Sequence, residues 1–252
     1  MRTATVEYKV YKYNELSEKA KEKVKQWYLE GREPFVFTEM CEEDLYNLFG
    51  KNDLHVQYSL GYCQGDGFNI YGKINAENIF KCLENHNGGN QLEKFENVLT
   101  DKEKKTILNY AYECGEIELS SNNRYCYCIA KHTDIADNWE YHLECYSGYA
   151  NINKKVLDKF EKLVHEIFTE LCNSYEKQGY EYFYEISEED LDEMCEANGY
   201  EFLEDGTTFW RKINLQKLKK DSWQISKYVV TCNYRKRKRR FTTWNNVQQW
   251  KI

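Results

Sequence analysis

Hydrophobic and polar residues recur with two different periods along this chain, and the changes of period divide it into predicted strands and helices. Residues 54–63 and 68–74 are rich in β-branched and aromatic side chains, and the run Gly65-Asp66-Gly67 lies between them. Asp-Gly between two such runs is a strong hairpin signal, because glycine adopts positive φ without steric cost. We therefore predict an antiparallel hairpin here, and expect the rest of the fold to be organised around it.

Apolar residues at helical spacing predict helices on both sides of this hairpin. Ser17 is a suitable N-cap for the first helix, and Gly31 follows its last turn. Thr100 with Glu103 forms a capping box, and Ser187 caps a later helix. The predicted helical ranges are 17–30, 35–49, a short helix within 75–90, 91–98, a helix from 100, 153–178 ended by Gly179, and 187–197.

Alternating patterns predict further strands over residues 3–13, 116–119, 124–131 and 139–146. A last hairpin is expected over 200–210, turning at Glu204-Asp205-Gly206. Strands and helices are segregated along the chain and do not alternate regularly. This order favours an α+β fold, in which helices cover one face of a mainly antiparallel sheet.

The charge is distributed unevenly. Residues 211–252 hold 13 Lys and Arg but one acid, whereas residues 1–210 hold 22 basic and 41 acidic residues. We predict two parts, an α+β core domain over 1–210 and a basic, β-rich C-terminal extension over 211–252.

Ten cysteines are present, yet the first residues contain no apolar core of a signal peptide. No apolar run approaches the ~18 residues of a membrane span. We expect a cytoplasmic protein whose thiols are reduced and mostly buried.

The hairpin tip supplies the first candidate site, formed by Tyr62, Gln64, Asp66 and Phe68. These residues would form a polar contact surface, or Asp66 would act as an acid or base. The alternative is a purely structural turn, in which the Asp66 carboxylate caps its own backbone. The sequence shows no second carboxylate near Asp66 that would pair with it as a catalytic acid or base, which weakens any hydrolase hypothesis.

Thiols and imidazoles gather between residues 126 and 145, and both groups are zinc ligands. The spacing does not match, because neither a Cys-x-x-Cys pair nor a His-x3-His pair occurs. Gly88-Gly89 also lacks the Lys-Ser/Thr of a phosphate-binding loop. We expect no metal and no cofactor. The residues considered as zinc ligands are Cys126, Cys128, His132, His142 and Cys145.

Six consecutive cations near the C-terminus form the second candidate site, and aromatic residues flank them. Cations contact phosphates and aromatic rings stack on bases, so this pattern is typical of nucleic-acid binding. The alternatives are a solvated strand pair and a tail that binds an acidic partner. The site comprises Tyr234, Arg235, Lys236, Arg237, Lys238, Arg239, Arg240 and Trp244, with Phe241 beside them.

Dense acidic clusters in the core domain have two interpretations as well. They would imitate a phosphate backbone and occupy a nucleic-acid site on another protein, or they would be solvated helix faces. The clusters comprise Glu42, Glu43, Asp44, Glu188, Glu189, Asp190, Asp192 and Glu193.

Two motifs resemble a family of small proteins from phages, prophages and mobile elements. The first is Cys63-Gln64-Gly65-Asp66-Gly67, in which Cys63 stands where the family has serine. The second runs from Asn198 to Gly206 and has the form Asn-x-Tyr-Glu-Phe-x-x-Asp-Gly. The resemblance spans about residues 5–210 and implies a phage-type accessory protein, with no catalytic activity attached.

Three functions compete at this point. The first is a phage-encoded inhibitor of a host defence system, such as an anti-CRISPR or anti-restriction protein, which binds a defence protein or ribonucleoprotein in the host cytoplasm. The second is a nucleic-acid-binding regulator or antitoxin-like protein that uses the basic C-terminal segment. The third is an enzyme acting on nucleotides or nucleic acids, which the lack of a catalytic constellation makes the weakest.

Overall fold

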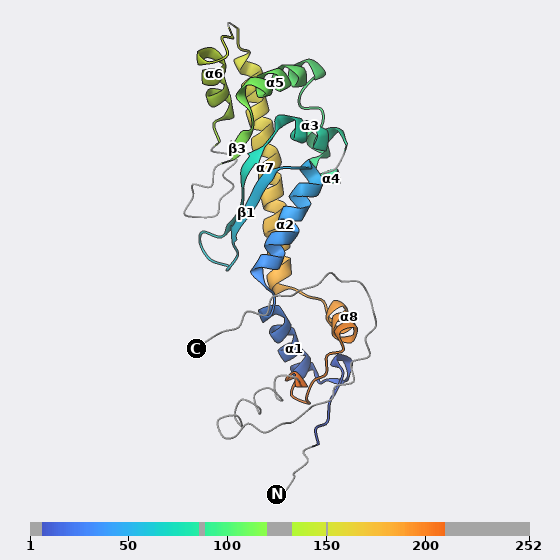
Figure 1. Ribbon diagram of the computed structural model, residues 1–252. Helices are drawn as coiled ribbons and strands as arrows, with labels where there is room; N and C mark the ends of the chain where they lie inside the picture. The colour runs from blue at the N-terminus through green and yellow to red at the C-terminus, as the bar shows by residue number, and fades with distance from the viewer. Residues whose placement is uncertain (1–6, 86–88, 120–132, 150, 210–252) are drawn as a thin grey trace, which may run out of the picture. The chain divides into compact units, whose positions relative to one another are not determined.

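The computed structural model describes residues 7–85, 89–119, 133–149 and 151–209, and this part of the chain has an α+β fold (Figure 1). The predicted basic extension and its candidate residues from Tyr234 to Trp244 lie outside the described residues, as does the predicted strand over 124–131. The helices and strands, with two 3-10 turns, are η1 (Tyr13–Glu15), α1 (Glu18–Glu30), α2 (Pro34–Phe49), β1 (Asp53–Ser59), β2 (Gly67–Ile74), α3 (Ala76–Glu84), α4 (Gly89–Leu92), η2 (Glu93–Phe95), α5 (Asp101–Cys114), β3 (Ile117–Leu119), α6 (Ile135–Cys145), α7 (Lys154–Tyr184) and α8 (Glu188–Asn198).

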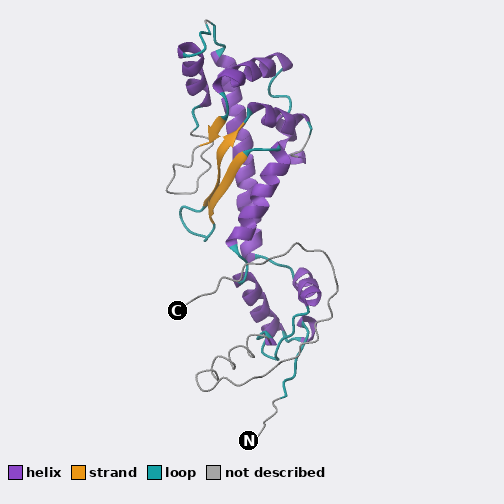
Figure 2. Ribbon diagram, viewed as in Figure 1, coloured by secondary structure: helices purple, strands orange, loops and turns teal. Residues whose placement is uncertain are grey.

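The sheet of the described residues has three antiparallel strands in the order β1-β2-β3 (Figure 2). The predicted hairpin forms its first two strands, with Ser59 opposite Gly67 at the loop end. Leu54 and Val56 of β1 are buried, whereas the alternate residues are exposed, as the period of two requires. The sequence pattern predicted a strand as far as residue 63. The strand β1 stops at Ser59, so residues 60–63 belong to the loop.

The long helix α7 packs against β2 and contributes many of the buried residues of the larger hydrophobic core. Its apolar stripe is buried along nearly its whole length, which confirms the helical face predicted from residues 156–171. Helices α2, α3, α5 and α6 complete this core around the sheet and α7. The buried residues of α7 are Val156, Leu157, Phe160, Leu163, Val164, Ile167, Phe168, Leu171, Cys172, Tyr175 and Gly179.

A second, smaller hydrophobic cluster joins α1, α8 and the segment that follows α8. Phe202 is fully buried there and pairs by single bridges with Tyr11 and Thr208. The turn at Glu204-Asp205-Gly206 is present, and Gly206 has φ +78°. A Cβ at Gly206 would collide with the Ala20 carbonyl of α1, so the second motif has a packing role here.

Local helix signals predicted from the sequence are confirmed. Ser17 accepts a hydrogen bond from the Ala20 backbone, and Ser187 accepts one from Asp190. Thr100 and Glu103 form the reciprocal capping box of α5.

Two strand predictions were wrong. Residues 139–146 lie largely in α6, where Ile135, Trp139 and Leu143 are buried at a helical spacing of four. The predicted strand over 3–13 is reduced, within the described residues, to the single bridge at Tyr11 followed by a 3-10 turn.

The prediction that Gly179 ends the long helix was also wrong, since α7 continues to Tyr184.

None of the described helices is both long and apolar enough to cross a membrane.

Candidate protein-binding site

The loop 60–66, which connects β1 to β2, contains a hydrogen-bonded cluster of sequence-predicted site residues. One carboxylate organises it. Asp66 Oδ2 accepts hydrogen bonds from the backbone N–H groups of Gly61 (2.7 Å) and Cys63 (3.0 Å). Asp66 Oδ1 accepts from the Ser59 hydroxyl at 3.1 Å and from the Cys63 thiol at 3.2 Å. The turn is therefore held by its own acidic residue, as the structural interpretation predicted.

A fifth donor comes from a distant part of the chain. The Tyr180 hydroxyl, on the last turns of α7, donates to Asp66 Oδ2 at 2.8 Å. This bond joins residues that are 114 positions apart and fixes the loop to the helix. No local sequence pattern around Asp66 indicates this partner.

These donors set the protonation of the site. The hydrogen bond from the Cys63 backbone, with those from Tyr180, Cys63 Sγ and Gly61, holds the pKa of Asp66 far below its ordinary value. Burial and the bond to Asp66 raise the pKa of Tyr180 to about 12, and the bond to Asp66 also raises the pKa of the Cys63 thiol. At neutral pH Asp66 is an ionised acceptor and Tyr180 a neutral donor. This arrangement orders a loop but does not suit a general acid or base.

The loop presents Tyr62 to solvent in a strained conformation. Tyr62 has φ +55°, the one positive φ among the described residues other than glycine, and 67% of its surface is exposed. Its ring lies against two tyrosines of α7, with centroid distances of 4.6 Å to Tyr180 and 4.7 Å to Tyr184. A bulky residue keeps a left-handed backbone conformation only where contacts with its surroundings compensate the strain. Residues strained in this way are concentrated at functional sites.

The base of the loop is seated on the helix by a close contact. The Tyr184 hydroxyl donates to the Leu60 carbonyl at 2.6 Å. Five residues earlier on α7, the backbone of Gly179 faces the Leu60 side chain and the Phe37 ring of α2. A Cβ at Gly179 would overlap Leu60 Cδ1 and lie 3.0 Å from Phe37 Cε1. Glycine is thus needed here for close approach, not for helix termination.

We call the rings of Tyr62, Tyr180 and Tyr184, together with loop 60–66, the tyrosine platform. Tyr62 and Tyr184 are exposed, and Tyr180 is half-buried between them and the loop. Gln64 lies exposed within this loop. Phe68 does not belong to the surface. It is 1% exposed and packs against Tyr58 and Tyr175, because it is an inward-facing residue of β2.

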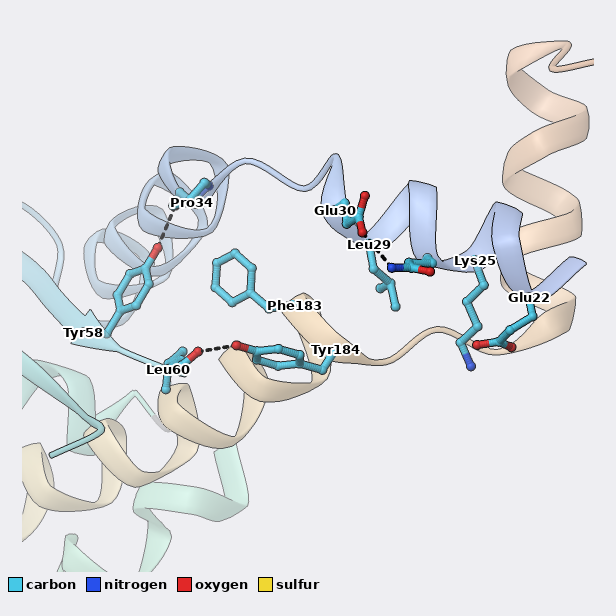
Figure 3. A pocket seen from close by; sticks show the side chains of 10 residues that line it. Glu22, Lys25, Leu29, Glu30, Pro34, Tyr58, Leu60, Phe183 and Tyr184 are labelled. Atoms are coloured by element: carbon cyan, nitrogen blue, oxygen red, sulfur yellow. Dashed lines mark hydrogen bonds between the residues drawn. The ribbon is translucent and has the colours of Figure 1, made fainter. Parts of the chain in front are cut away.

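An open groove of about 610 Å³ borders the platform (Figure 3). Leu60 and Tyr184 line it, as do Phe183 and Leu29, and the hydrogen bond from Tyr58 to the Pro34 carbonyl crosses one side. Its lining combines aromatic and aliphatic side chains with a few charged groups, which is the usual composition of a binding surface. Glu22, Lys25, Gln26 and Glu30 also line the groove.

Arg32 fixes the segment between α1 and α2 to the end of α7. Its guanidinium donates to the carbonyls of Glu181 (3.4 Å) and Glu185 (3.2 Å) at the C-terminus of α7. The Glu181 carbonyl also accepts the backbone N–H of Glu185, the C-cap residue. It also lies over the rings of Tyr28 and Tyr182, at 5.0 and 4.9 Å. A cation at this end of a helix complements the helix dipole.

No group of three or more possible metal ligands occurs among the described residues. His142 lies on α6 beside Tyr146, and Cys145 is exposed at the end of that helix. The other residues considered as zinc ligands, Cys126, Cys128 and His132, lie outside the described part of the chain.

None of the described cysteines forms a disulfide. Cys41, Cys82, Cys172 and Cys195 are buried, whereas Cys63 and Cys145 are exposed. Burial raises the pKa of Cys195 to about 11 and that of Cys41 to about 12, so these thiols are inert at neutral pH.

The sequence identified the loop but missed the surface on which it packs. Tyr180 and Tyr184 are four residues apart on a helix, a spacing that places them on one face. That pair was the available signal, but nothing in the sequence connects it to a loop more than 110 residues earlier.

Comparison with known proteins adds no relative: no protein-family model, no curated protein and no solved structure matches this chain.

Proposed function

We propose that this chain is a binding protein, and that the tyrosine platform is the surface it presents to a protein of the host cell. The observation that carries the proposal is the exposed, strained Tyr62, whose ring lies against Tyr180 and Tyr184 and whose loop is fixed to α7 by the hydrogen bond from Tyr180 to Asp66. Tyrosine supplies a large contact area at low entropic cost, so a rigid tyrosine cluster suits protein recognition.

The chemistry of Asp66 supports binding over catalysis. The five hydrogen bonds that Asp66 accepts within the described residues order the loop, and its pKa is held well below the range useful to a general base at neutral pH. Cys63 donates its thiol to the same carboxylate. A serine hydroxyl, which the resembling family has at this position, would make the same kind of bond.

The biological role we propose is that of a phage- or mobile-element-encoded inhibitor, which blocks a host defence protein or ribonucleoprotein by occupying its surface. This finer part of the proposal is supported by the resemblance of the two motifs. The inhibitor would act in the cytoplasm of the host.

The test uses host strains that each carry one defined defence system, with phage plating as the readout. Expression of the chain should restore plating on at least one of these strains, and Tyr62→Ala should abolish the rescue. Tyr112→Ala is the matched control, because Tyr112 is 87% exposed on α5 and is not part of the platform. Failure to restore plating on any strain would count against the inhibitor role. Equal rescue by wild type and Tyr62→Ala would reject the platform.

A second candidate function rests on the basic run from Arg235 to Arg240, which favours nucleic-acid binding. A salt titration of DNA and RNA binding would test it, because each phosphate contact adds to the slope of affinity against salt concentration. Replacing the six cations by Gln should remove that slope. A salt-independent affinity would reject this candidate.

A further inference from the structure

Helix α2 carries an unusual combination of charge and exposed apolar surface. Its sixteen residues include four acids, Glu39, Glu42, Glu43 and Asp44, and no Lys or Arg. Its inner face is part of the main core, through Phe37, Cys41, Leu45, Leu48 and Phe49. The outer face is therefore the part whose composition the fold itself does not require.

Two of the four acids have partners within the fold. Glu42 Oε1 lies 3.0 Å from His55 Nδ1, and Asp44 accepts a hydrogen bond from the Tyr175 hydroxyl. Glu39 and Glu43 are exposed, and no ion pair or hydrogen bond of their side chains is present within the described residues. They are four residues apart and so lie on one side of the helix.

Large apolar side chains flank these two acids. Phe35 is 46% exposed, Met40 53% and Tyr46 59%. Scattered exposed apolar residues are normal, but here three occur on one helix, around two carboxylates that have no cationic partner in the described part of the chain. Methionine is flexible and polarisable, and is over-represented on surfaces that bind helical segments of other proteins.

Helix α8 shows that acidity alone does not produce this combination. It carries six acids, including the exposed pair Glu189 and Glu193 at the same spacing of four. None of its residues is among the exposed large hydrophobic residues. It has the composition of a solvated helix face, and α2 does not.

We infer that the outer face of α2 binds a cationic amphipathic segment of a partner protein. Apolar side chains of that segment would cover Phe35, Met40 and Tyr46, while its Lys or Arg side chains would pair with Glu39 and Glu43. Charge complementarity selects this occupant, because an acidic or purely apolar segment would leave the two carboxylates repelled or desolvated without partners. The inference concerns a surface other than the tyrosine platform and does not depend on it.

The experiment uses the full-length chain and a fluorescent ~14-residue peptide of Leu and Lys at helical spacing, which is long enough to form a helix on binding. A peptide of the same pattern with Glu for Lys is the negative probe. The basic run of the chain does not attract the Lys peptide, since both are positively charged. Anisotropy gives the affinity, and hydrogen exchange locates the protected residues.

The double variant Glu39→Gln/Glu43→Gln should weaken binding of the Lys peptide roughly tenfold at low salt, as expected for the loss of two surface ion pairs. Met40→Gln should weaken it at every salt concentration, because the apolar contact is not screened. Glu189→Gln/Glu193→Gln is the matched control and should change the affinity less than about twofold. Hydrogen exchange should show protection over residues 35–47 in the complex.

Three results would overturn the inference. One is equal weakening by the α2 and α8 double variants, which would mean that the peptide senses only diffuse acidity. Another is the absence of Lys-peptide binding, or equal binding of the Glu peptide. The third is concentration-dependent self-association of the wild-type chain that the α2 variants abolish, which would make a second copy of the chain the occupant.

Discussion

Replacement of Gly179 by Ala tests how the loop is seated on α7. Considered as a helix position alone, the substitution should stabilise the protein by ~1 kcal/mol, because alanine has the higher helix propensity. The structure predicts the opposite sign. The new Cβ would overlap Leu60 Cδ1 and lie 3.0 Å from Phe37 Cε1.

The two neighbours differ in how far they can yield. Leu60 presents the end of a flexible side chain. Phe37 is 2% exposed, and its ring is enclosed by those of Tyr58, Tyr182 and Phe183, with centroid distances of 5.3, 5.2 and 5.5 Å. Overpacking of a core costs about 1–3 kcal/mol, so we expect a net loss of ~1 kcal/mol after the gain in helix propensity.

Urea unfolding and thermal melting measure this loss, which corresponds to a fall of roughly 2–4 °C in Tm for a chain of this size. Asn173→Ala on the exposed face of the same helix is the control, and should be neutral or slightly stabilising. In a Leu60→Ala background the cost of Gly179→Ala should shrink by ~0.5 kcal/mol or more, since contacting residues are energetically coupled. A Gly179→Ala variant that is more stable than wild type, with no coupling to Leu60, would refute the close-contact explanation.

Two further predictions concern the loop itself. Because the pKa of Asp66 is depressed in the folded state, the stability contributed by its carboxylate should be fully present above about pH 4 and be lost as the pH falls below it. Asp66→Asn should remove this part of the acid dependence of Tm. An unchanged acid profile in the variant would contradict the role of the Asp66 carboxylate in holding the loop. Gly65 has φ +106°, so Gly65→Ala should cost ~1–2 kcal/mol in urea unfolding. Gly61→Ala is the control in the same loop, since its Cβ would meet nothing closer than 3.8 Å, and equal costs for the two variants would argue against backbone strain at Gly65.

The positive φ in this loop is at a different glycine from the one that the Asp-Gly pattern indicates. The Asp-Gly signal predicts a tight turn in which Gly67 needs positive φ, but Gly67 is the first residue of β2 and Gly65 has the positive φ. The loop is longer because Asp66 binds donors at Ser59, Gly61 and Cys63, which requires the chain to wrap around its carboxylate.

Features that depend on a few neighbouring residues were predictable from the sequence. The caps at Ser17, Thr100 and Ser187 formed as predicted, because a side chain and the backbone groups it satisfies lie within one helical turn. The β1–β2 hairpin and the apolar stripe of α7 were also predictable, because the spacing of their apolar residues along the sequence matches the period of a strand and of a helix.

Tertiary packing decided the remaining features. Residues 139–146 contain enough aromatic and alternating positions to resemble a strand, but burying Trp139 and Leu143 against α7 requires a helix. Gly179 resembles a helix terminator until Leu60 and Phe37 pack against it. The tyrosine platform depends on the bonds from Tyr180 to Asp66 and from Tyr184 to Leu60, which join residues 114 and 124 positions apart. The sequence by itself determined where the loop is and which carboxylate holds it; only the fold decided which helix the loop packs on, because contacts at such separations follow from the packing of whole elements and leave no local pattern.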